Sequence, residues 1–282
     1  MSDVRVGVVG TGFIGLEHVE RFENNINGAS VSAIVEPDES RARTALQISP
    51  NAQWFPTIES ALESKAMDAV LIATPGQFHE PVILPVLEYG LPILCEKPLT
   101  PDPDSSLRIV NAEIAKGRKL IQVGFMRRYD AGYMELKSLI ASKKQGELLG
   151  LHCAHRNPSV PDSYHNEMLI FDSVVHEIDV VRFLTDSPIK TVQVRHLKRN
   201  SLSPERLQEP ILVLLETESG VLATVEMNVS VQFGYQVKTE AVFENGIAEI
   251  GRTGGMTTWF DAKVSNQEHV SFKTRFAAAY DT

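Results

Sequence analysis

The sequence predicts an α/β protein in which a doubly wound parallel sheet is followed by an α+β domain with an open, mostly antiparallel sheet. The first 124 residues alternate apolar strand segments with helical segments, which is typical of a parallel sheet. From residue 147 onward, strands with apolar residues at every second position predominate, as in a sheet with one covered face. A length of 282 residues is sufficient for two hydrophobic cores. We therefore expect two domains, residues 1–124 and 125–282.

The segment Val4–Gly15 reads as an apolar strand, a glycine-rich turn and the start of a helix. Gly10, Gly12 and Gly15 have the G-x-G-x-x-G spacing of a dinucleotide-binding turn. The first glycine permits the tight turn, the second lets a pyrophosphate approach the backbone, and the third lets the helix lie close to the strand. The second strand ends at Glu36, where a carboxylate can accept hydrogen bonds from the adenosine ribose. The pattern predicts a Rossmann domain.

Glu36 also indicates which dinucleotide is bound. A carboxylate at this position repels a 2′-phosphate, so we expect NAD as the cofactor rather than NADP. Arg41 and Arg43 lie close by in the sequence and leave NADP as an open possibility. The alternative interpretation is a structural turn followed by an unrelated surface glutamate.

The other elements of the first domain are predicted from apolar runs and from the residues that end them. Pro37 and the pair Pro75-Gly76 each end a strand, and Thr57 is the expected N-cap of a helix. The expected strands cover residues 4–9, 31–35, 54–55, 68–74, 92–95 and 120–123. The expected helices cover residues 16–22, 39–47, the residues after Thr57, 81–89 and 107–115.

Ligands of doubly wound sheets bind at the carboxyl ends of the strands. Several residues follow the predicted strands at that edge, and we expect them to contact the cofactor together with the residues of the glycine turn. The expected cofactor-binding residues are Gly10, Gly12, Phe13, Ile14, Gly15, Glu36, Thr74, Pro75, His79, Glu96 and Lys97.

In the second domain, residues 221–231 form the clearest strand, because apolar and mostly polar residues alternate along it. Its expected neighbours are residues 193–196, 211–216, 236–243 and 257–264, and the expected helices are residues 133–142 and 171–184. A large exposed apolar sheet face is costly in water. We therefore expect this domain to mediate self-association as well as to bind the substrate.

Composition excludes several classes of partner. The net charge is −9 and no cluster of lysine or arginine stands out, which argues against a nucleic acid or an anionic membrane. The only cysteines are Cys95 and Cys153, so neither a disulfide framework nor a four-cysteine zinc site is expected. No signal peptide and no run long enough to span a bilayer is found. We expect a cytoplasmic protein.

Asp172 and His176 are four residues apart in a predicted helix, which places both on one face. Histidine suits proton transfer near neutral pH, and a carboxylate one turn earlier can orient it. The alternative is an ordinary surface ion pair. His176, Glu177 and Asp179 read H-E-x-D and not H-E-x-x-H, so no metal is expected.

Lys97 follows an apolar strand in the sequence CEKPL. A lysine at the carboxyl end of such a strand can hydrogen-bond a substrate oxygen and lower its pKa. Pro98 restricts Lys97 to extended geometry. The alternative is a solvated pair with Glu96.

Together, the glycine motif, E-K-P at Glu96–Pro98 and D-x-x-x-H at Asp172–His176 resemble the glucose–fructose oxidoreductase/inositol dehydrogenase/MocA family. Longer strings resemble its inositol dehydrogenase branch: QVGFMRRYD (Gln122–Asp130), HCAHRNP (His152–Pro158), VHEIDV (Val175–Val180) and RFAAAYD (Arg275–Asp281).

The resemblance implies NAD-dependent oxidation of a cyclic polyol, myo-inositol to 2-keto-myo-inositol. It implies Lys97, Asp172 and His176 as catalytic residues: His176 takes the hydroxyl proton, Asp172 orients His176, and Lys97 polarises the reacting oxygen. The side-chain nitrogens of Lys97 and His176 are then expected to act at one carbon of the substrate.

The resemblance further implies substrate contacts from Arg127, His155, Asn157 and Tyr235, in addition to the catalytic residues. Hydrogen-bonding groups of this kind reject substrates that lack the matching hydroxyl. The alternatives are a solvated basic pair for Arg127 and Arg128, and a structural core histidine for His155.

Two functional alternatives stay open: a related dehydrogenase that acts on scyllo-inositol or an aldose, and a non-catalytic NAD-binding sensor. The resemblance also implies a homotetramer, and a largely helical C-terminal extension of roughly another fifth of the chain, which this sequence is expected to lack.

Overall fold

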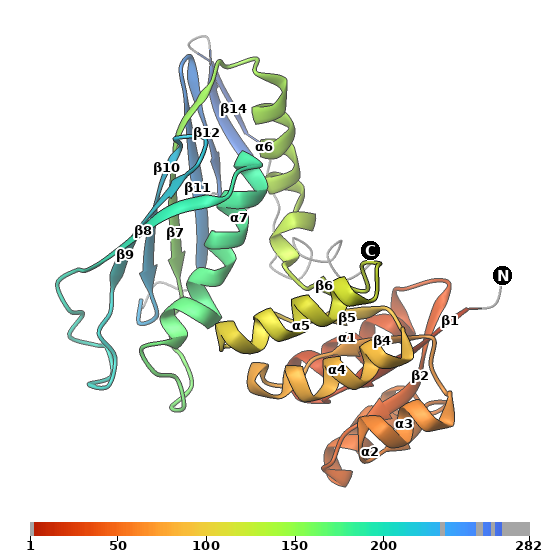
Figure 1. The fold of residues 1–282 in the computed structure, drawn as a ribbon. Coiled ribbons are helices and arrows are strands. Elements are labelled where there is room, and N and C mark those ends of the chain that lie inside the picture. Colours follow the sequence, from red (N-terminus) through yellow and green to blue (C-terminus); the bar gives the residue numbers. More distant parts are fainter. Residues whose placement is uncertain (1–2, 232–234, 252–255, 261–262, 267–282) are drawn as a thin grey trace. The chain divides into compact units, whose positions relative to one another are not determined.

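The computed structural model describes residues 3–231, 235–251, 256–260 and 263–266. The chain divides into two units, one up to Phe125 and one from Met126 onward, which we name the N-terminal unit and the C-terminal unit (Figure 1). Among the helices in the described residues, none is both long and apolar enough to cross a bilayer. The string Arg275–Asp281 lies outside the described residues.

The N-terminal unit contains a six-stranded sheet in the order β3-β2-β1-β4-β5-β6, and all neighbouring strands are parallel. The strands are β1 (Val4–Val9), β2 (Ala29–Val35), β3 (Gln53–Phe55), β4 (Ala69–Ile72), β5 (Ile93–Cys95) and β6 (Ile121–Val123). The helices are α1 (Phe13–Asn24), α2 (Glu39–Ile48), α3 (Ile58–Ser64), the 3₁₀ turn η1 (Gly76–Phe78), α4 (His79–Tyr89) and α5 (Pro103–Ala115). The predicted doubly wound sheet is confirmed. Its strand order reverses between β1 and β4, which is where ligands of such sheets bind.

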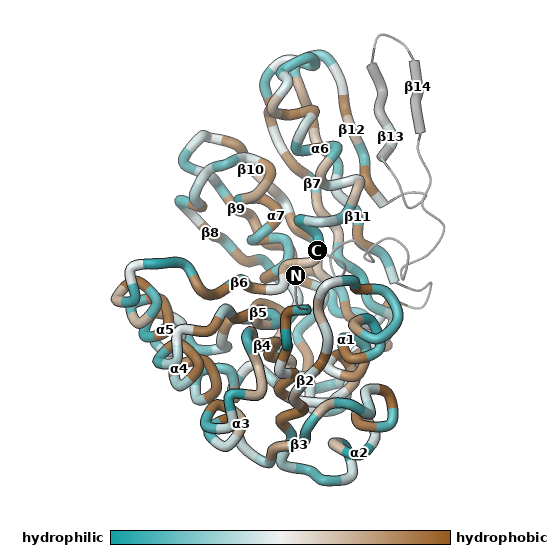
Figure 2. The backbone as a smooth tube through the Cα atoms, turned by 90° about the vertical axis from the view of Figure 1, so that its right-hand side faces the viewer, coloured by the Kyte–Doolittle hydropathy of each residue, from teal (hydrophilic) through white to brown (hydrophobic). Residues whose placement is uncertain are grey.

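Apolar side chains fill both faces of this sheet, because successive residues of a strand point to opposite sides. Val70 and Ile72 of β4 belong to the cluster covered by α3, α4 and α5, whereas Leu71 belongs to the cluster covered by α1 and α2. Burying one such side chain contributes about 1.5–3 kcal/mol. The brown stretches of the tube in Figure 2 show this apolar character along β2 and α4. Val4, at the amino end of β1, is 45% exposed.

Side-chain caps define where several helices of this unit begin. Thr57 accepts a hydrogen bond from the amide of Ser60 at 3.3 Å, so the predicted N-cap of α3 is confirmed. Asp102 caps α5 by accepting from the amide of Ser105 at 2.8 Å, and Pro103 occupies the first turn. The helix therefore begins one turn before its predicted start at Leu107, because an aspartate followed by proline is a favourable helix start.

The C-terminal unit contains an eight-stranded sheet in the order β14-β13-β12-β11-β7-β10-β9-β8. The strands are β7 (Leu148–Arg156), β8 (Ile189–His196), β9 (Ile211–Thr217), β10 (Leu222–Asn228), β11 (Gln236–Phe243), β12 (Gly246–Ile250), β13 (Met256–Phe260) and β14 (Lys263–Asn266). The helical elements are η2 (Met126–Tyr129), α6 (Ala131–Ser142), η3 (Leu169–Val174) and α7 (Val175–Thr185). Among the described strands of this unit, only the pair β7–β10 is parallel, so the predicted open, mostly antiparallel sheet is confirmed.

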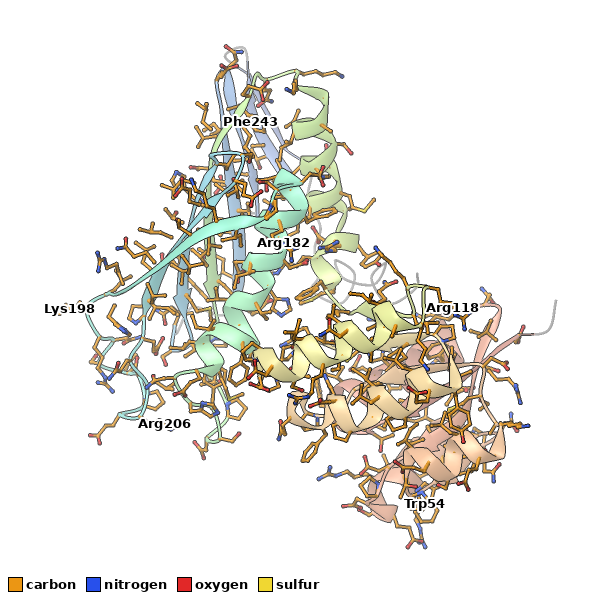
Figure 3. All side chains as sticks on the ribbon, viewed as in Figure 1. Trp54, Arg118, Arg182, Lys198, Arg206 and Phe243 are labelled. Carbon is orange, nitrogen blue, oxygen red and sulfur yellow. The ribbon has the colours of Figure 1, made fainter. Side chains whose placement is uncertain are left out.

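The core of this unit lies between one face of the sheet and the helices α6 and α7 (Figure 1). Along β10, Ala223, Val225 and Met227 are buried, which is the alternation that the sequence predicted. Figure 3 marks Phe243, a buried core residue at the end of β11, and Arg182 on α7. Arg182 is exposed, so it lies outside the core of this unit.

Three predicted elements of this unit have different bounds. The strand predicted over 221–231 ends at Asn228, and the strand predicted over 257–264 is two strands, β13 and β14. The helix predicted over 171–184 begins instead as a π-helix, η3, and becomes α-helical at Val175. The hydroxyl of Tyr164 donates to the carbonyl of Met168 at 2.8 Å. This bond lies at the residue before the π-helical turn.

Candidate active site

The glycine turn between β1 and α1 is shaped by the absence of side chains. Gly10 has φ +84°, and a Cβ there would lie 2.7 Å from a methyl group of Thr74. A Cβ at Gly15 would lie 1.9 Å from the carbonyl oxygen of Gly10, so the helix can approach the turn only without a side chain. At Gly12 a Cβ would meet nothing within 4 Å, which leaves open space beside the backbone. The turn therefore fits the cradle that a pyrophosphate needs.

The first turn of α1 is open to an anion. Gly12 is its N-cap and supplies no side-chain hydrogen bond, and no acidic residue lies in the first turn. Phe13 is 80% exposed and Ile14 is 39% exposed. The amide groups and the dipole of a helix N-terminus favour a phosphate in such a position.

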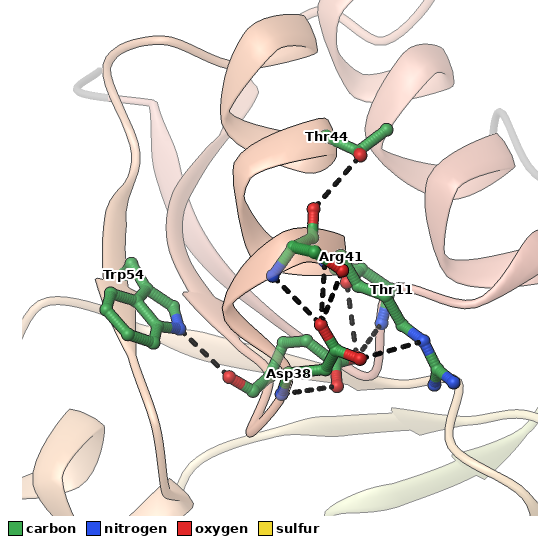
Figure 4. Close-up of polar contacts among 7 residues, drawn as sticks. Thr11, Asp38, Arg41, Thr44 and Trp54 are labelled. Carbon is green, nitrogen blue, oxygen red and sulfur yellow. Dashed lines mark hydrogen bonds and ion pairs between the residues drawn. The ribbon is translucent and has the colours of Figure 1, made fainter.

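Glu36 is 4% exposed, so the alternative of an unrelated surface glutamate is wrong. Its Oε2 accepts hydrogen bonds from the amide of Thr11 at 2.9 Å and from the Thr11 hydroxyl at 3.2 Å. Its Oε1 accepts from the amide of Asp38 at 3.1 Å, and the main-chain carbonyl of Glu36 accepts from Trp54 (Figure 4). A carboxylate has about four acceptor positions. Three are in use within the protein, which leaves capacity for a ribose hydroxyl.

The two arginines near Glu36 are engaged by acidic neighbours. Arg41 Nε lies 3.8 Å from Asp38 Oδ2, and Arg43 Nη2 lies 2.5 Å from Glu39 Oε1. An open hollow beside α2 is lined by Pro37, Asp38, Glu39, Ser40 and Arg43. With carboxylates beside both guanidinium groups, the surroundings of Glu36 disfavour an additional phosphate, which supports the expectation of NAD.

His79 is completely buried, and both of its ring nitrogens face main-chain carbonyls. Nδ1 lies 2.9 Å from the oxygen of Pro98 and 3.1 Å from that of Leu99, and Nε2 lies 2.8 Å from the oxygen of Thr74. The ring thus ties the end of β4 to the segment that follows Lys97. These partners hold the ring in place, and the contact of His79 with the cofactor stays a prediction.

The segment after β5 carries Glu96 and Lys97. Glu96 Oε1 lies 2.9 Å from Nε2 of His18, a buried residue of α1 that the sequence did not single out. The Lys97-Pro98 peptide bond is cis, which the expected extended geometry did not include. Cys95 is buried, and burial, followed by the charge of Glu96, raises the pKa of its thiol.

In the C-terminal unit, predicted site residues gather around His155 of β7. The His155 ring lies 6.1 Å, between centroids, from the ring of His176 in the first turn of α7. It lies at the same distance from the Tyr235 ring, edge to face. Arg127 of η2 has its Nη2 at 3.3 Å from His155 Nδ1. Asn157 lies two residues beyond His155, and its amide donates to the carbonyl of Asn228 at 2.8 Å.

A charged residue that the sequence suggested only as a rejected metal ligand completes this cluster. Glu177 is 1% exposed, and its Oε1 accepts a short hydrogen bond from Arg127 Nη1. Its Oε2 lies 3.3 Å from His155 Nδ1. Burial alone raises the pKa of Glu177, but Arg127 and His155 outweigh burial and lower the pKa to about 2. Glu177 is therefore ionised at neutral pH.

Arg127 is 1% exposed, so the alternative of a solvated basic pair is wrong for this residue. Burial lowers its pKa, but the charge of Glu177 outweighs burial and raises the pKa above the ordinary value. Arg128, the next residue, has a side chain 43% exposed, and its Nη2 donates to Asp179 Oδ1 at 2.7 Å. The two adjacent arginines thus pair with two carboxylates of one helix, and among the described residues only the first pair contacts a histidine.

Asp172 lies in η3 and His176 in α7, so the two residues do not share one regular α-helix as predicted. A π-helical turn takes more residues than an α-helical turn, which changes the faces that a spacing of four connects. Such turns occur frequently at functional sites. In the part of the chain that the structure describes, no three His, Cys, Asp or Glu residues form a group suited to a metal ion.

Comparison with known proteins gives matches along the chain. Residues 4–125 match a family model described as "Oxidoreductase family, NAD-binding Rossmann fold", and residues 133–249 match the "GFO/IDH/MocA C-terminal domain". Inositol 2-dehydrogenase of Corynebacterium glutamicum is 56% identical over 280 residues, which cover 99% of this chain and 83% of that protein. The protein of the same name from Leifsonia xyli subsp. xyli is 55% identical over 279 residues, covering 99% and 82%. The chain is also similar to a solved structure of myo-inositol dehydrogenase from Lactobacillus casei, which is in complex with NAD(H) and myo-inositol. The TM-score is 0.89 and the sequence identity is 35%, and the match covers 99% of this chain and 83% of that chain.

Proposed function

Because the chain belongs to the GFO/IDH/MocA oxidoreductase family, with its NAD-binding Rossmann fold, we propose that it is an NAD-dependent inositol 2-dehydrogenase. The reaction is the oxidation of myo-inositol to 2-keto-myo-inositol. The observation that carries this proposal is the 56% identity to an inositol 2-dehydrogenase over 99% of the chain. The ionised, buried cluster around His155 supports it, because a polyol site needs fixed hydrogen-bonding groups.

The residues of the N-terminal unit fit NAD. The open space at Gly12 and the uncapped start of α1 suit the pyrophosphate, and the remaining acceptor position of Glu36 suits the adenosine ribose. Phe13, Ile14, Thr74, Pro75, Glu96 and Lys97 are the further cofactor contacts in this proposal, with His79 holding the segment around them. Bound NAD supplies the hydride acceptor.

The chain's own residues then handle the proton and the orientation of the substrate. His176 takes the proton of the reacting hydroxyl, Asp172 orients His176, and Lys97 donates a hydrogen bond to the reacting oxygen. As the carbinol carbon loses a hydride and its oxygen loses a proton, the product is a ketone. Arg127, His155, Asn157 and Tyr235 bind the other hydroxyls of the ring.

We further propose that the protein works as a homotetramer in the cytoplasm. The C-terminal unit exposes apolar side chains on its strands, among them Val192 at 60%, Leu149 at 55% and Leu222 at 48%. A second copy that covers such side chains removes apolar surface from water. Cys95 and Cys153 are free, buried thiols, which suits a reducing compartment. Light scattering at micromolar concentration tests the tetramer, and a monomer contradicts it.

The proposed activity is tested by mixing the full chain with NAD and each of several polyols while NADH absorbance is followed. We expect NADH with myo-inositol, and less with scyllo-inositol or an aldose. A preference for scyllo-inositol or an aldose shifts the assignment to that substrate. Cofactor binding without NADH from any of these substrates contradicts the enzyme and favours a sensor.

A further inference from the structure

We propose that Glu177 is a positioning residue for substrate recognition, which fixes His155 in the tautomer that carries its proton on Nδ1. This inference rests on the proposed function, because His155 is one of its substrate-binding residues. Glu177 lies beside His176 in sequence, in the first turn of α7, and is almost wholly buried. The structure gives it two partners, Arg127 and His155.

His155 Nδ1 has two possible hydrogen-bond partners and can bond to only one of them. This nitrogen lies 3.3 Å from Arg127 Nη2, which can only donate, and 3.3 Å from Glu177 Oε2, which when ionised can only accept. A neutral imidazole nitrogen is either a donor or an acceptor, so the two hydrogen bonds exclude each other. Whichever bond forms determines the role of the other ring nitrogen, Nε2.

Charge decides in favour of Glu177. The carboxylate concentrates its charge on two oxygens, whereas the guanidinium spreads its charge over the whole planar group. The hydrogen bond from His155 Nδ1 to Glu177 is therefore stronger than the one from Arg127 to Nδ1. Arg127 Nη1 already donates to Glu177 Oε1, which holds the carboxylate with Oε2 toward the imidazole. His155 therefore donates from Nδ1 to Glu177. Nε2, which has no hydrogen bond with the described residues, is left as an acceptor for a hydroxyl of the substrate.

Replacing Glu177 by glutamine is expected to move the His155 proton from Nδ1 to Nε2, with little change in the shape of the side chain. The new amide oxygen can keep the bond from Arg127, and the amide NH₂ then occupies the place of Oε2. Nδ1 now faces two donors, the introduced amide NH₂ and the Arg127 guanidinium, and becomes an acceptor. The proton moves to Nε2, which then offers the substrate a donor where the wild-type protein offers an acceptor.

Asp179→Asn is the matched control, because it makes the same chemical change in the neighbouring pair. Asp179 is two residues further along α7, is 5% exposed, and pairs with Arg128, the residue after Arg127. Its hydrogen bonds go to the guanidinium of Arg128 and not to a histidine. A purely structural effect of losing a carboxylate on α7 therefore appears in both variants.

The experiment uses the full chain and measures the His155 tautomer by heteronuclear NMR of the histidine side chains, assigned with a His155→Asn variant. We expect the Nδ1 proton in the wild type and in Asp179→Asn, and the Nε2 proton in Glu177→Gln. In steady-state kinetics with excess NAD, we expect the KM for myo-inositol of Glu177→Gln to rise about tenfold, the effect of one hydrogen bond. Its dissociation constant for NAD stays within about twofold of the wild-type value, a change too small for a lost contact.

The proton on Nε2 in the wild type overturns the inference, whether or not the variants fold. An unchanged tautomer in Glu177→Gln, or an equal rise of KM in Asp179→Asn, also overturns it. If the wild-type chain forms no NADH from any polyol, the proposed function fails, but the tautomer measurement still decides the role of Glu177.

Discussion

The glycine turn of the N-terminal unit and the Arg127–Glu177–His155 cluster of the C-terminal unit are built on opposite principles. The turn depends on the absence of side chains, because a Cβ at Gly15 would overlap a main-chain oxygen. The cluster depends on charged side chains that are almost fully buried. The glycine turn thus keeps space open beside the backbone, whereas the cluster depends on a balance of buried charges.

The largest expected effect is on the stability of the C-terminal unit. Glu177→Gln leaves the Arg127 charge buried without its counter-ion, and removing one partner of such a pair typically costs about 3–5 kcal/mol. Urea unfolding measures this loss. The double variant Arg127→Met/Glu177→Met is the control, since replacing both partners by apolar residues is often neutral. If it is no more stable than Glu177→Gln, unpaired charge is not the cause.

Two glycine substitutions in the turn are expected to differ: one lowers the stability of the protein, and the other lowers its affinity for NAD. Gly15→Ala should lower the free energy of unfolding by about 1–3 kcal/mol, because the new methyl group overlaps Gly10. Gly12→Ala meets no protein atom, so its melting temperature should stay near the wild-type value while NAD affinity falls about tenfold or more. Thermal melts and NAD titrations distinguish the two. Wild-type NAD affinity in Gly12→Ala contradicts the assignment of this space to the pyrophosphate.

A smaller effect is expected at Glu36. Glu36→Gln removes the charge that accepts ribose hydrogen bonds and repels a 2′-phosphate, and bonds to charged groups are worth about 1.5–3 kcal/mol. NAD should bind about tenfold more weakly, and the preference for NAD over NADP should decrease. Dissociation constants for both dinucleotides check this. Glu88→Gln, an exposed glutamate of α4 that pairs with Lys116, is the control and should leave the preference unchanged.

The smallest effects concern stability at low pH. Glu177 and Asp68 have similar pKa values, but Glu177 is buried and Asp68 is exposed. Arg127 and His155, against the effect of burial, lower the pKa of Glu177 from 4.5 to about 2, and the hydrogen bond from Arg5 lowers that of Asp68 from 3.8 to about 2. A lowered folded-state pKa stabilises the protein above the unfolded value, and this stability is lost as the pH falls toward 2. Asp68 is solvent-exposed, so its effect should be small and should vanish in salt.

The measurement is urea unfolding across this pH range for the wild type, Glu177→Gln and Asp68→Asn. Glu177→Gln should show a clearly flatter dependence of stability on pH, and Asp68→Asn should follow the wild type closely. A larger change in Asp68→Asn contradicts the role given to burial.

Much of the fold could be predicted because its signals are local. Apolar runs, prolines and the glycine spacing place the strands and helices of the N-terminal unit within a few residues. The parallel pairing of β7 with β10 has no such signal, since the two strands are far apart in sequence. The π-helical start at η3 has no local signal either, because the spacing of apolar residues does not distinguish one π-helical turn from an α-helical turn.

In the candidate site, too, residues close together in sequence could be predicted, whereas contacts between distant residues could not. Gly10, Gly12, Gly15 and Glu36 could be proposed from spacing alone, because one turn and one strand end bring them to the same edge. The bond between Arg127 and Glu177 joins residues 50 positions apart. Nothing in the local sequence indicates that these charges are buried together, so the sequence alone does not predict the role of Glu177.

In the proposed mechanism, the N-terminal unit binds the cofactor and His176 of the C-terminal unit takes the proton. His176→Ala tests this division most directly, with kcat for myo-inositol and the dissociation constant for NAD measured on the same preparation. We predict that kcat falls by about 10²–10⁴-fold, the usual contribution of a general base, while NAD affinity is unchanged. A wild-type kcat, or equal losses in turnover and NAD affinity, contradicts the account.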